Sequence, residues 1–181
     1  MNFQDISLKR RYKTYKDNII QDFYIPTLEQ SKIYKRAVGF FSSSALIELS
    51  KGISGLIAND GYIQLIVSPK LETEDIIAIN DGYKVKNIIN HAINRGFKEP
   101  TNPIDLERLT WIGHLIATNH LDIKVAFTKN ISNGMYHEKN GILIDGFGNK
   151  IAFEGSMNET SNAFHNNGES IIVFKSWDSI Q

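Results

Sequence analysis

Short apolar runs rich in β-branched and aromatic residues alternate along this sequence with longer segments of helical periodicity. This alternation is typical of an α/β domain, in which helices pack against the faces of a sheet. A chain of 181 residues with 41% hydrophobic residues is long enough to close one such domain around its own core. We therefore predict a single α/β domain. Its clearest strands are 37–41, 62–67, 123–127, 141–144, 151–153 and 170–174.

The helical periodicity falls in three segments between the predicted strands. Apolar residues recur at helical spacing over 45–57, and the polar turn 59–61 closes that helix before the second strand. Thr73 and the acidic residues after it form an N-cap and first turn for a helix over 76–89. A third helix is predicted over 106–116, after a loop with two prolines.

Composition excludes several kinds of protein. The chain has 20 basic and 20 acidic residues, so any binding of a polyanion must be local. It has no cysteine, which excludes disulfides, thiolate zinc sites and a cysteine nucleophile. It has neither a signal-peptide pattern nor an apolar run of the ~18 residues that a membrane span needs. We expect a cytoplasmic protein without a membrane partner. His114, His120 and His165 lack the spacing of zinc ligands, so no metal or other cofactor is expected.

The most informative residues lie in the last third of the chain. In an extended segment His137 and Lys139 point the same way and face one ligand. After the predicted strand 151–153, Ser156 and Glu159 have the spacing of a capping box, and Asn158 lies between them. Helix N-termini attract phosphate. Lys139, Ser156 and Asn158 are therefore the predicted phosphate-binding residues, with His137 as a nucleophile beside them.

This order of residues, H-x-K, then G-S-x-N, then an acidic residue, resembles the phospholipase D superfamily. The resemblance is to its nuclease branch, which includes restriction endonucleases. The superfamily places an aspartate five residues after the lysine, whereas this chain has Ile144 there and Asp145 one position later. A one-residue shift turns a side chain to the opposite face of a strand. In the endonuclease branch a later glutamate takes that place, and Glu169 occupies it here.

A second resemblance covers 36–45 and 65–69, which look like the opening of phospholipase D-like modules fused to DEAD/DEAH-box helicases. It implies a phospholipase D-like domain over 36–176, with a mixed central sheet flanked by helices on both faces. Residues 1–35 are then an N-terminal basic and helical extension. Residues 177–181 are the start of a linker to a helicase-like region.

The resemblance implies a phosphodiesterase, an endonuclease that forms a phosphohistidine without a metal. The expected catalytic residues are His137 as nucleophile, Lys139 and Asn158 as ligands of the phosphate oxygens, and Glu169 as the acceptor that orients the His137 ring. A single motif supplies one histidine, so a homodimer with a composite site is expected. DNA is the expected substrate, with single-stranded DNA and RNA left open, and a helicase of a restriction system is the expected partner.

Other interpretations remain open. Two features favour a catalytically inactive module for DNA binding or dimerisation. Asp145 is shifted by one residue from the superfamily pattern, and the chain has zero net charge. A lipid or small phosphodiester hydrolase is disfavoured because the sequence predicts no membrane-binding helix. The run from Lys9 to Lys16 is interpreted as a solvated arm, with contact to a nucleic-acid backbone as the alternative.

Overall fold

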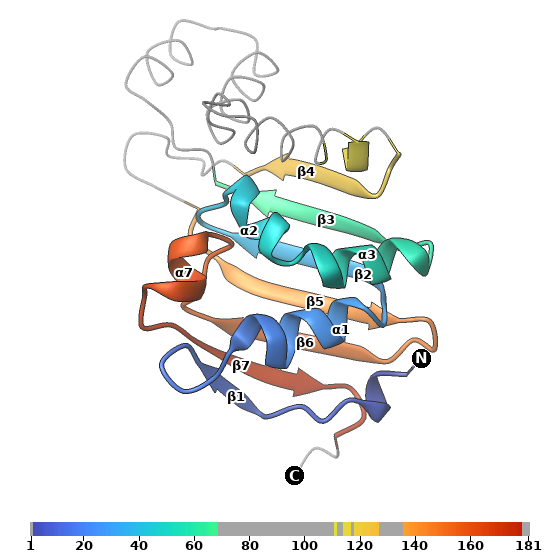
Figure 1. Ribbon diagram of the computed structural model, residues 1–181, viewed down its shortest axis with the longest axis horizontal. Helices are drawn as coiled ribbons and strands as arrows, with labels where there is room; N and C mark the ends of the chain where they lie inside the picture. The colour runs from blue at the N-terminus through green and yellow to red at the C-terminus, as the bar shows by residue number, and fades with distance from the viewer. Residues whose placement is uncertain (1, 69–110, 112–113, 117, 127–135, 179–181) are drawn as a thin grey trace, which may run out of the picture.

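The computed structural model describes residues 2–68, 111, 114–116, 118–126 and 136–178. The helix predicted over 76–89 lies outside these residues, as does most of the one predicted over 106–116. The described residues form one seven-stranded sheet with the strand order β1-β7-β6-β5-β2-β3-β4 (Figure 1). The strands are β1 (Arg11–Lys13), β2 (Ser31–Val38), β3 (Tyr62–Val67), β4 (Leu121–Val125), β5 (Lys139–Asp145), β6 (Lys150–Gly155) and β7 (Ser170–Lys175).

The sheet is mixed, which confirms the predicted fold class. Strand β2 pairs parallel with β3, and β3 pairs parallel with β4. The other pairs are antiparallel, including β2 with β5. The helical segments are η1 (Phe3–Asp5), η2 (Ile20–Tyr24), α1 (Ile25–Leu28), α2 (Ser43–Glu48), α3 (Ser50–Ala58) and α7 (Ser161–His165).

Helices α1, α2, α3 and α7 lie on one side of the sheet, toward the viewer in Figure 1. The helix predicted over 45–57 is divided in two, since Leu49 lies outside the helical region with φ −89° and ψ 2°. Alternate strand residues pack under these helices, such as Tyr34 and Val38 of β2 and Leu65 of β3, all buried. None of the helices in the described ranges combines the length and hydrophobicity of a membrane span.

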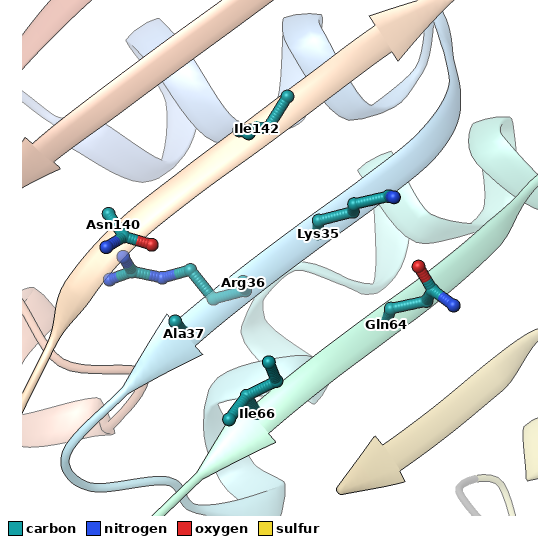
Figure 2. Close-up of a pocket in the computed structure, with 7 residues that line it drawn as sticks. All are labelled: Lys35, Arg36, Ala37, Gln64, Ile66, Asn140 and Ile142. Atoms are coloured by element: carbon teal, nitrogen blue, oxygen red, sulfur yellow. The ribbon is translucent and has the colours of Figure 1, made fainter. Parts of the chain in front are cut away.

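The opposite face of the sheet carries apolar side chains that remain exposed, among them Ile66 (40%) and Phe174 (51%). A hollow on this side lies between β5, β2 and β3 (Figure 2). Its lining residues are Lys35, Arg36, Ala37, Gln64, Ile66, Asn140 and Ile142.

The first 35 residues are part of the same domain, which corrects their assignment to a separate extension. Strand β1 extends the sheet by pairing with β7, with Arg11 opposite Ile172. Phe3, Tyr12 and Phe23 are fully or almost fully buried in the common core. The prediction failed because a three-residue strand and a five-residue π-helix are too short to show a period in the sequence.

Asp145 has a structural position at the end of β5. Asp145 is 3% exposed. It accepts hydrogen bonds of 2.8–2.9 Å from the backbone N–H groups of Phe3, Phe147 and Asn149 and from Asn149 Nδ2. Burial works to raise the pKa of Asp145, but these hydrogen bonds lower it below its ordinary value of 3.8. The carboxylate thus closes the β5–β6 turn and fastens the N-terminal segment to it.

We expect Asp145→Asn to lower the free energy of unfolding at neutral pH by about 1–3 kcal/mol, because an amide cannot accept from every one of these N–H groups. The folded-state pKa is depressed, so the stabilisation is complete above the ordinary pKa and is lost as the pH falls through the lower folded value. Urea unfolding should therefore show that the difference in free energy of unfolding between wild type and variant becomes smaller as the pH is lowered from about 5 to about 2.

The matched control for this prediction is Asp122→Asn, on the exposed surface of β4. It should change stability by no more than about 0.5 kcal/mol. Equal effects of the two substitutions would contradict the role given to Asp145.

Candidate active site

Three motif residues meet at one end of the sheet. Strand β2 ends there at Val38, which pairs with Lys139 at the start of β5, and β6 ends beside them. Gly39 lies beneath the point where they meet. A Cβ added to Gly39 would lie 2.7 Å from His137 Cδ2 and 3.5 Å from Asn158 Oδ1. The close approach of His137 to the backbone therefore leaves no room for a Cβ at this position, whereas Asn158 lies at ordinary contact distance.

His137 lies just before β5 and is exposed. Its ring meets the Phe40 ring edge to face, with the centroids 6.1 Å apart and the planes at 84°. Lys139 Nζ donates to the His137 carbonyl oxygen at 3.2 Å, so the ammonium lies beside the histidine backbone. The ring nitrogens of an exposed imidazole are accessible to a ligand.

The side chain of Asn158 has a defined orientation. Its Oδ1 accepts a hydrogen bond of 3.0 Å from the Phe40 backbone N–H. Only the oxygen of the amide can accept from an N–H, so the Nδ2 group points away from that contact and is the end that can donate to a ligand. The backbone of the loop after β2 thus fixes which atom of Asn158 faces the site.

Ser156 joins the end of β6 to the start of β7. Its Oγ accepts from the Ser170 N–H at 3.1 Å, and its own N–H donates to the Ser170 carbonyl oxygen at 3.1 Å. The capping box predicted from Ser156 and Glu159 is wrong. Helix α7 begins later, at Ser161, and its N-cap is Thr160, whose side chain accepts from Ala163 N–H.

Glu159 instead lies in the core, in a network that the sequence did not predict. It is fully buried. Its carboxylate accepts from the Tyr34 hydroxyl at 2.5 Å and the Tyr24 hydroxyl at 3.4 Å, and lies 3.5 Å from Arg36 Nε. We name these four residues, Tyr24, Tyr34, Arg36 and Glu159, the Glu159 network. In this network the buried guanidinium of Arg36 neutralises the buried carboxylate of Glu159, and the hydroxyl groups of the two tyrosines donate hydrogen bonds to that carboxylate.

The Glu159 network holds the two loops that carry the site. Arg36 Nη2 donates to the Met157 carbonyl oxygen at 2.5 Å, next to Asn158. The Glu159 backbone accepts from Ser42 N–H at 2.8 Å and donates to the Phe40 carbonyl oxygen at 3.3 Å. The loop after β2 and the turn after β6 are therefore joined at their bases.

The pKa values of Tyr24, Tyr34 and Arg36 are shifted inside the Glu159 network. Burial and the Glu159 carboxylate raise the pKa values of Tyr24 and Tyr34. Both phenols therefore remain protonated and donate. Burial alone would lower the pKa of Arg36, but Tyr24 and Glu159 raise it above its ordinary value, so the guanidinium stays charged.

Lys139 lies in an electrostatically mixed environment. Burial lowers its pKa, the carboxylate of Glu169 opposes this, and the charge of Arg36 lowers it again. Glu169 accepts a hydrogen bond of 3.2 Å from Asn167 Nδ2. No hydrogen bond joins Glu169 to His137 among the described residues. The structure therefore brings His137, Lys139 and Asn158 together, and the charge of Glu169 acts on Lys139.

The other described histidines lie apart from this group. His120 Nδ1 is 2.7 Å from the Gly61 carbonyl oxygen, before β3, and His165 Nε2 contacts the carboxylate of Glu48. Within the described ranges, no set of three His, Asp or Glu side chains is placed to hold a metal ion.

Known proteins share this fold. A family model described as "Cardiolipin synthase, PLD-like domain" matches residues 56–181. NucT from Helicobacter pylori aligns with a TM-score of 0.50 and 17% identity, over 90% of this chain and 83% of its own. Phosphatidylserine synthase from Haemophilus influenzae Rd KW20 aligns with a TM-score of 0.53 and 14% identity, over 92% of this chain and 34% of its own.

A phospholipase D family member, Nuc from Salmonella typhimurium, aligns with a TM-score of 0.46 and 11% identity, over 86% of this chain and 75% of its own. None of the curated protein sequences matches the chain. At these identities, the alignments with NucT and the synthase show a common fold.

Proposed function

Because the chain belongs to the phospholipase D-like family, we propose that it is a phosphodiesterase that cleaves nucleic acid with His137 as its nucleophile. The observation that carries this proposal is the convergence of His137, Lys139 and Asn158 above Gly39. An imidazole, an ammonium and an amide donor at one point form a suitable site for a phosphate that is attacked by nitrogen.

The proposed reaction has two steps. The neutral ring of His137 attacks phosphorus, a P–N bond forms, the P–O bond to the leaving group breaks, and a second histidine gives its proton to the leaving oxygen. Water then attacks phosphorus, the second histidine takes the water proton, and the P–N bond breaks. Lys139 and Asn158 Nδ2 stabilise the charge on the non-bridging oxygens, and Ser156 is proposed as a further ligand of the phosphate. This chemistry needs no metal ion.

Glu169 is the proposed acidic member of the site. Its carboxylate favours the charged form of Lys139. To accept from the far ring nitrogen of His137, as the family resemblance implies, it has to exchange its hydrogen bond with Asn167 for one with the histidine. We propose that substrate binding brings about this exchange.

The second histidine is proposed to come from another copy of the chain. The motif occurs once in the sequence, so a twofold dimer with its axis at the site supplies both histidines. A molar mass of one chain at the concentration used for the activity assay would contradict a composite site.

DNA is the proposed substrate, and a helicase or restriction system is the proposed context, because the sequence resembles the nuclease branch of the family. A single-stranded DNA or RNA substrate is compatible with the same residues. The alternative is an inactive module for DNA binding or dimerisation. It is supported by the absence, among the described residues, of a hydrogen bond between His137 and Glu169.

The experiment that tests the proposed function is hydrolysis in excess EDTA. Plasmid DNA, single-stranded DNA, RNA, bis(p-nitrophenyl) phosphate and phosphatidylcholine vesicles are offered separately to the wild-type protein. We expect cleavage of nucleic acid and of bis(p-nitrophenyl) phosphate to survive the chelator. Cleavage of phosphatidylcholine alone would mean that the substrate is a lipid and not nucleic acid. Loss of all cleavage on adding EDTA would contradict the mechanism, and no cleavage with or without EDTA would favour the inactive module.

A further inference from the structure

The turn that follows β1 exposes an aromatic ring between two ammonium groups. Tyr15 is 66% exposed, and its ring centroid lies 5.4 Å from Lys13 Nζ and 6.0 Å from Lys16 Nζ. The pKa of Tyr15 is lowered by its hydrogen bond with Lys13 and then by the charges of Lys13, Lys16 and Arg11, a sign of positive local potential. We name residues 13–16 the basic turn.

The basic turn is held in one shape by its own hydrogen bonds. The Lys16 and Asp17 N–H groups both donate to the Lys13 carbonyl oxygen at 2.9 Å. Asp17 Oδ2 accepts from Lys13 N–H at 2.8 Å, and its Oδ1 pairs with Lys9 Nζ at 2.6 Å. Asp17 is therefore engaged by Lys9 and by backbone. In the described part of the chain, no ion pair within 4.0 Å involves Lys13 or Lys16.

The basic turn is also tied directly to the candidate active site. Thr14 N–H donates to the Glu169 carbonyl oxygen at 3.0 Å, and Glu169 N–H donates to Thr14 Oγ1 at 2.9 Å. Thr14 Oγ1 donates to the Asn167 carbonyl oxygen at 2.7 Å. The turn is fixed beside Glu169, so it is not part of a free arm, which corrects the sequence-based interpretation, whereas Lys16 is exposed to solvent as predicted.

The position of the basic turn in the sheet sets its distance from the site. Lys13 pairs with Ser170 at the start of β7, beside the end of β6 and the start of β5, so the turn and Lys139 lie at the same end of the sheet. Three strand spacings separate β1 from β5, which is about 14 Å. A ligand that reaches both has to be an extended chain.

We propose that the basic turn is a binding site for single-stranded nucleic acid, on the path of the strand whose phosphodiester lies at His137. Lys13 and Lys16 would contact backbone phosphates, and a base would stack on the exposed ring of Tyr15. A base inside a duplex has no free face to stack, so the site selects unpaired strands. The basic turn lies outside the residues that the family model matches, 56–181. This inference rests on the proposed function for its substrate class.

Two readouts test the proposal. The first is the affinity for a fluorescent single-stranded oligonucleotide, measured by anisotropy in EDTA at several salt concentrations. Tyr15→Ala should weaken binding about tenfold, whereas Tyr15→Phe should bind like wild type. The double variant Lys13→Gln, Lys16→Gln should reduce the slope of log Kd against log salt by about 1.4, since each neutralised phosphate of a single strand contributes about 0.7.

The second readout is hydrolysis of bis(p-nitrophenyl) phosphate, which is too small to reach the basic turn. Its kcat should be unchanged in Tyr15→Ala, while KM for single-stranded DNA rises. The matched controls are Tyr62→Ala, on the opposite end of the sheet, and Lys51→Gln, on α3, both exposed. Equal oligonucleotide affinity of Tyr15→Ala and Tyr62→Ala would overturn the proposal even if the protein is a nuclease. Tyr15-dependent binding without hydrolysis would support it while contradicting the proposed function.

Discussion

His137→Ala is expected to lower kcat for DNA cleavage in EDTA by about 10³-fold or more. In the proposed mechanism His137 forms the bond to phosphorus, so alanine removes the nucleophile and leaves only the donors that bind phosphate. A composite site also loses its general acid, because the same substitution removes the histidine of the second copy. Single-turnover cleavage of labelled DNA would measure this loss without interference from product release.

The matched control for His137→Ala is His165→Ala, which removes another exposed histidine on α7. It should leave kcat within about twofold of wild type, because His165 contacts Glu48 rather than the site. Both variants should keep the thermal midpoint of the wild type, since neither ring is buried. Cleavage by His137→Ala at the wild-type rate would mean that another group, or another protein in the sample, does the chemistry.

Glu159→Ala is expected to lower the free energy of unfolding by about 3–5 kcal/mol, the largest stability effect predicted for this chain. Removal of the carboxylate leaves the Arg36 guanidinium buried without its counter-charge and deprives the Tyr24 and Tyr34 hydroxyls of their acceptor. Urea unfolding followed by tryptophan fluorescence would measure it as a lower midpoint at an unchanged slope.

Two further variants accompany Glu159→Ala: one is a surface control, and the other removes the buried charges of both partners. Glu154→Ala, on the exposed side of β6, should change stability by no more than about 0.5 kcal/mol. Glu159→Gln combined with Arg36→Met should be more stable than Glu159→Ala, because no unpaired charge remains buried. If Glu159→Ala and Glu154→Ala unfold at the same urea concentration, the Glu159 network contributes nothing to the fold.

Strands with a regular alternation of buried and exposed residues could be predicted closely from the sequence. The predicted strand 62–67 matches β3, and 170–174 matches β7 to within one residue. Predicted strand 37–41 was placed too late, because β2 begins at Ser31 and contains a buried charged residue, Arg36. A buried arginine breaks the apolar pattern that marks a strand, so the first half of β2 was missed.

The motif residues of the candidate site could be recognised from the sequence because their order is characteristic. The residues that hold them in place could not be recognised in this way. The hydrogen bond from Phe40 N–H to Asn158 and the contact of Gly39 with His137 join residues far apart in the chain. Glu159 has the spacing of a capping residue, and only its three-dimensional neighbours distinguish a cap from a buried ion pair. Asp145 lies at the far end of β5 from Lys139, where it accepts hydrogen bonds from the N-terminal segment and the β5–β6 turn.

The pairing of β1 with β7 joins segments that lie far apart in the sequence, since Arg11 lies opposite Ile172. During synthesis on the ribosome, β1 and the aromatic residues around it have to wait for the last strand before they can complete the sheet. Contacts of such long sequence separation are slow to form, because a large loop must close first. The newly made chain therefore passes through a stage in which its central strands can pair while Tyr12 and Phe23 remain uncovered.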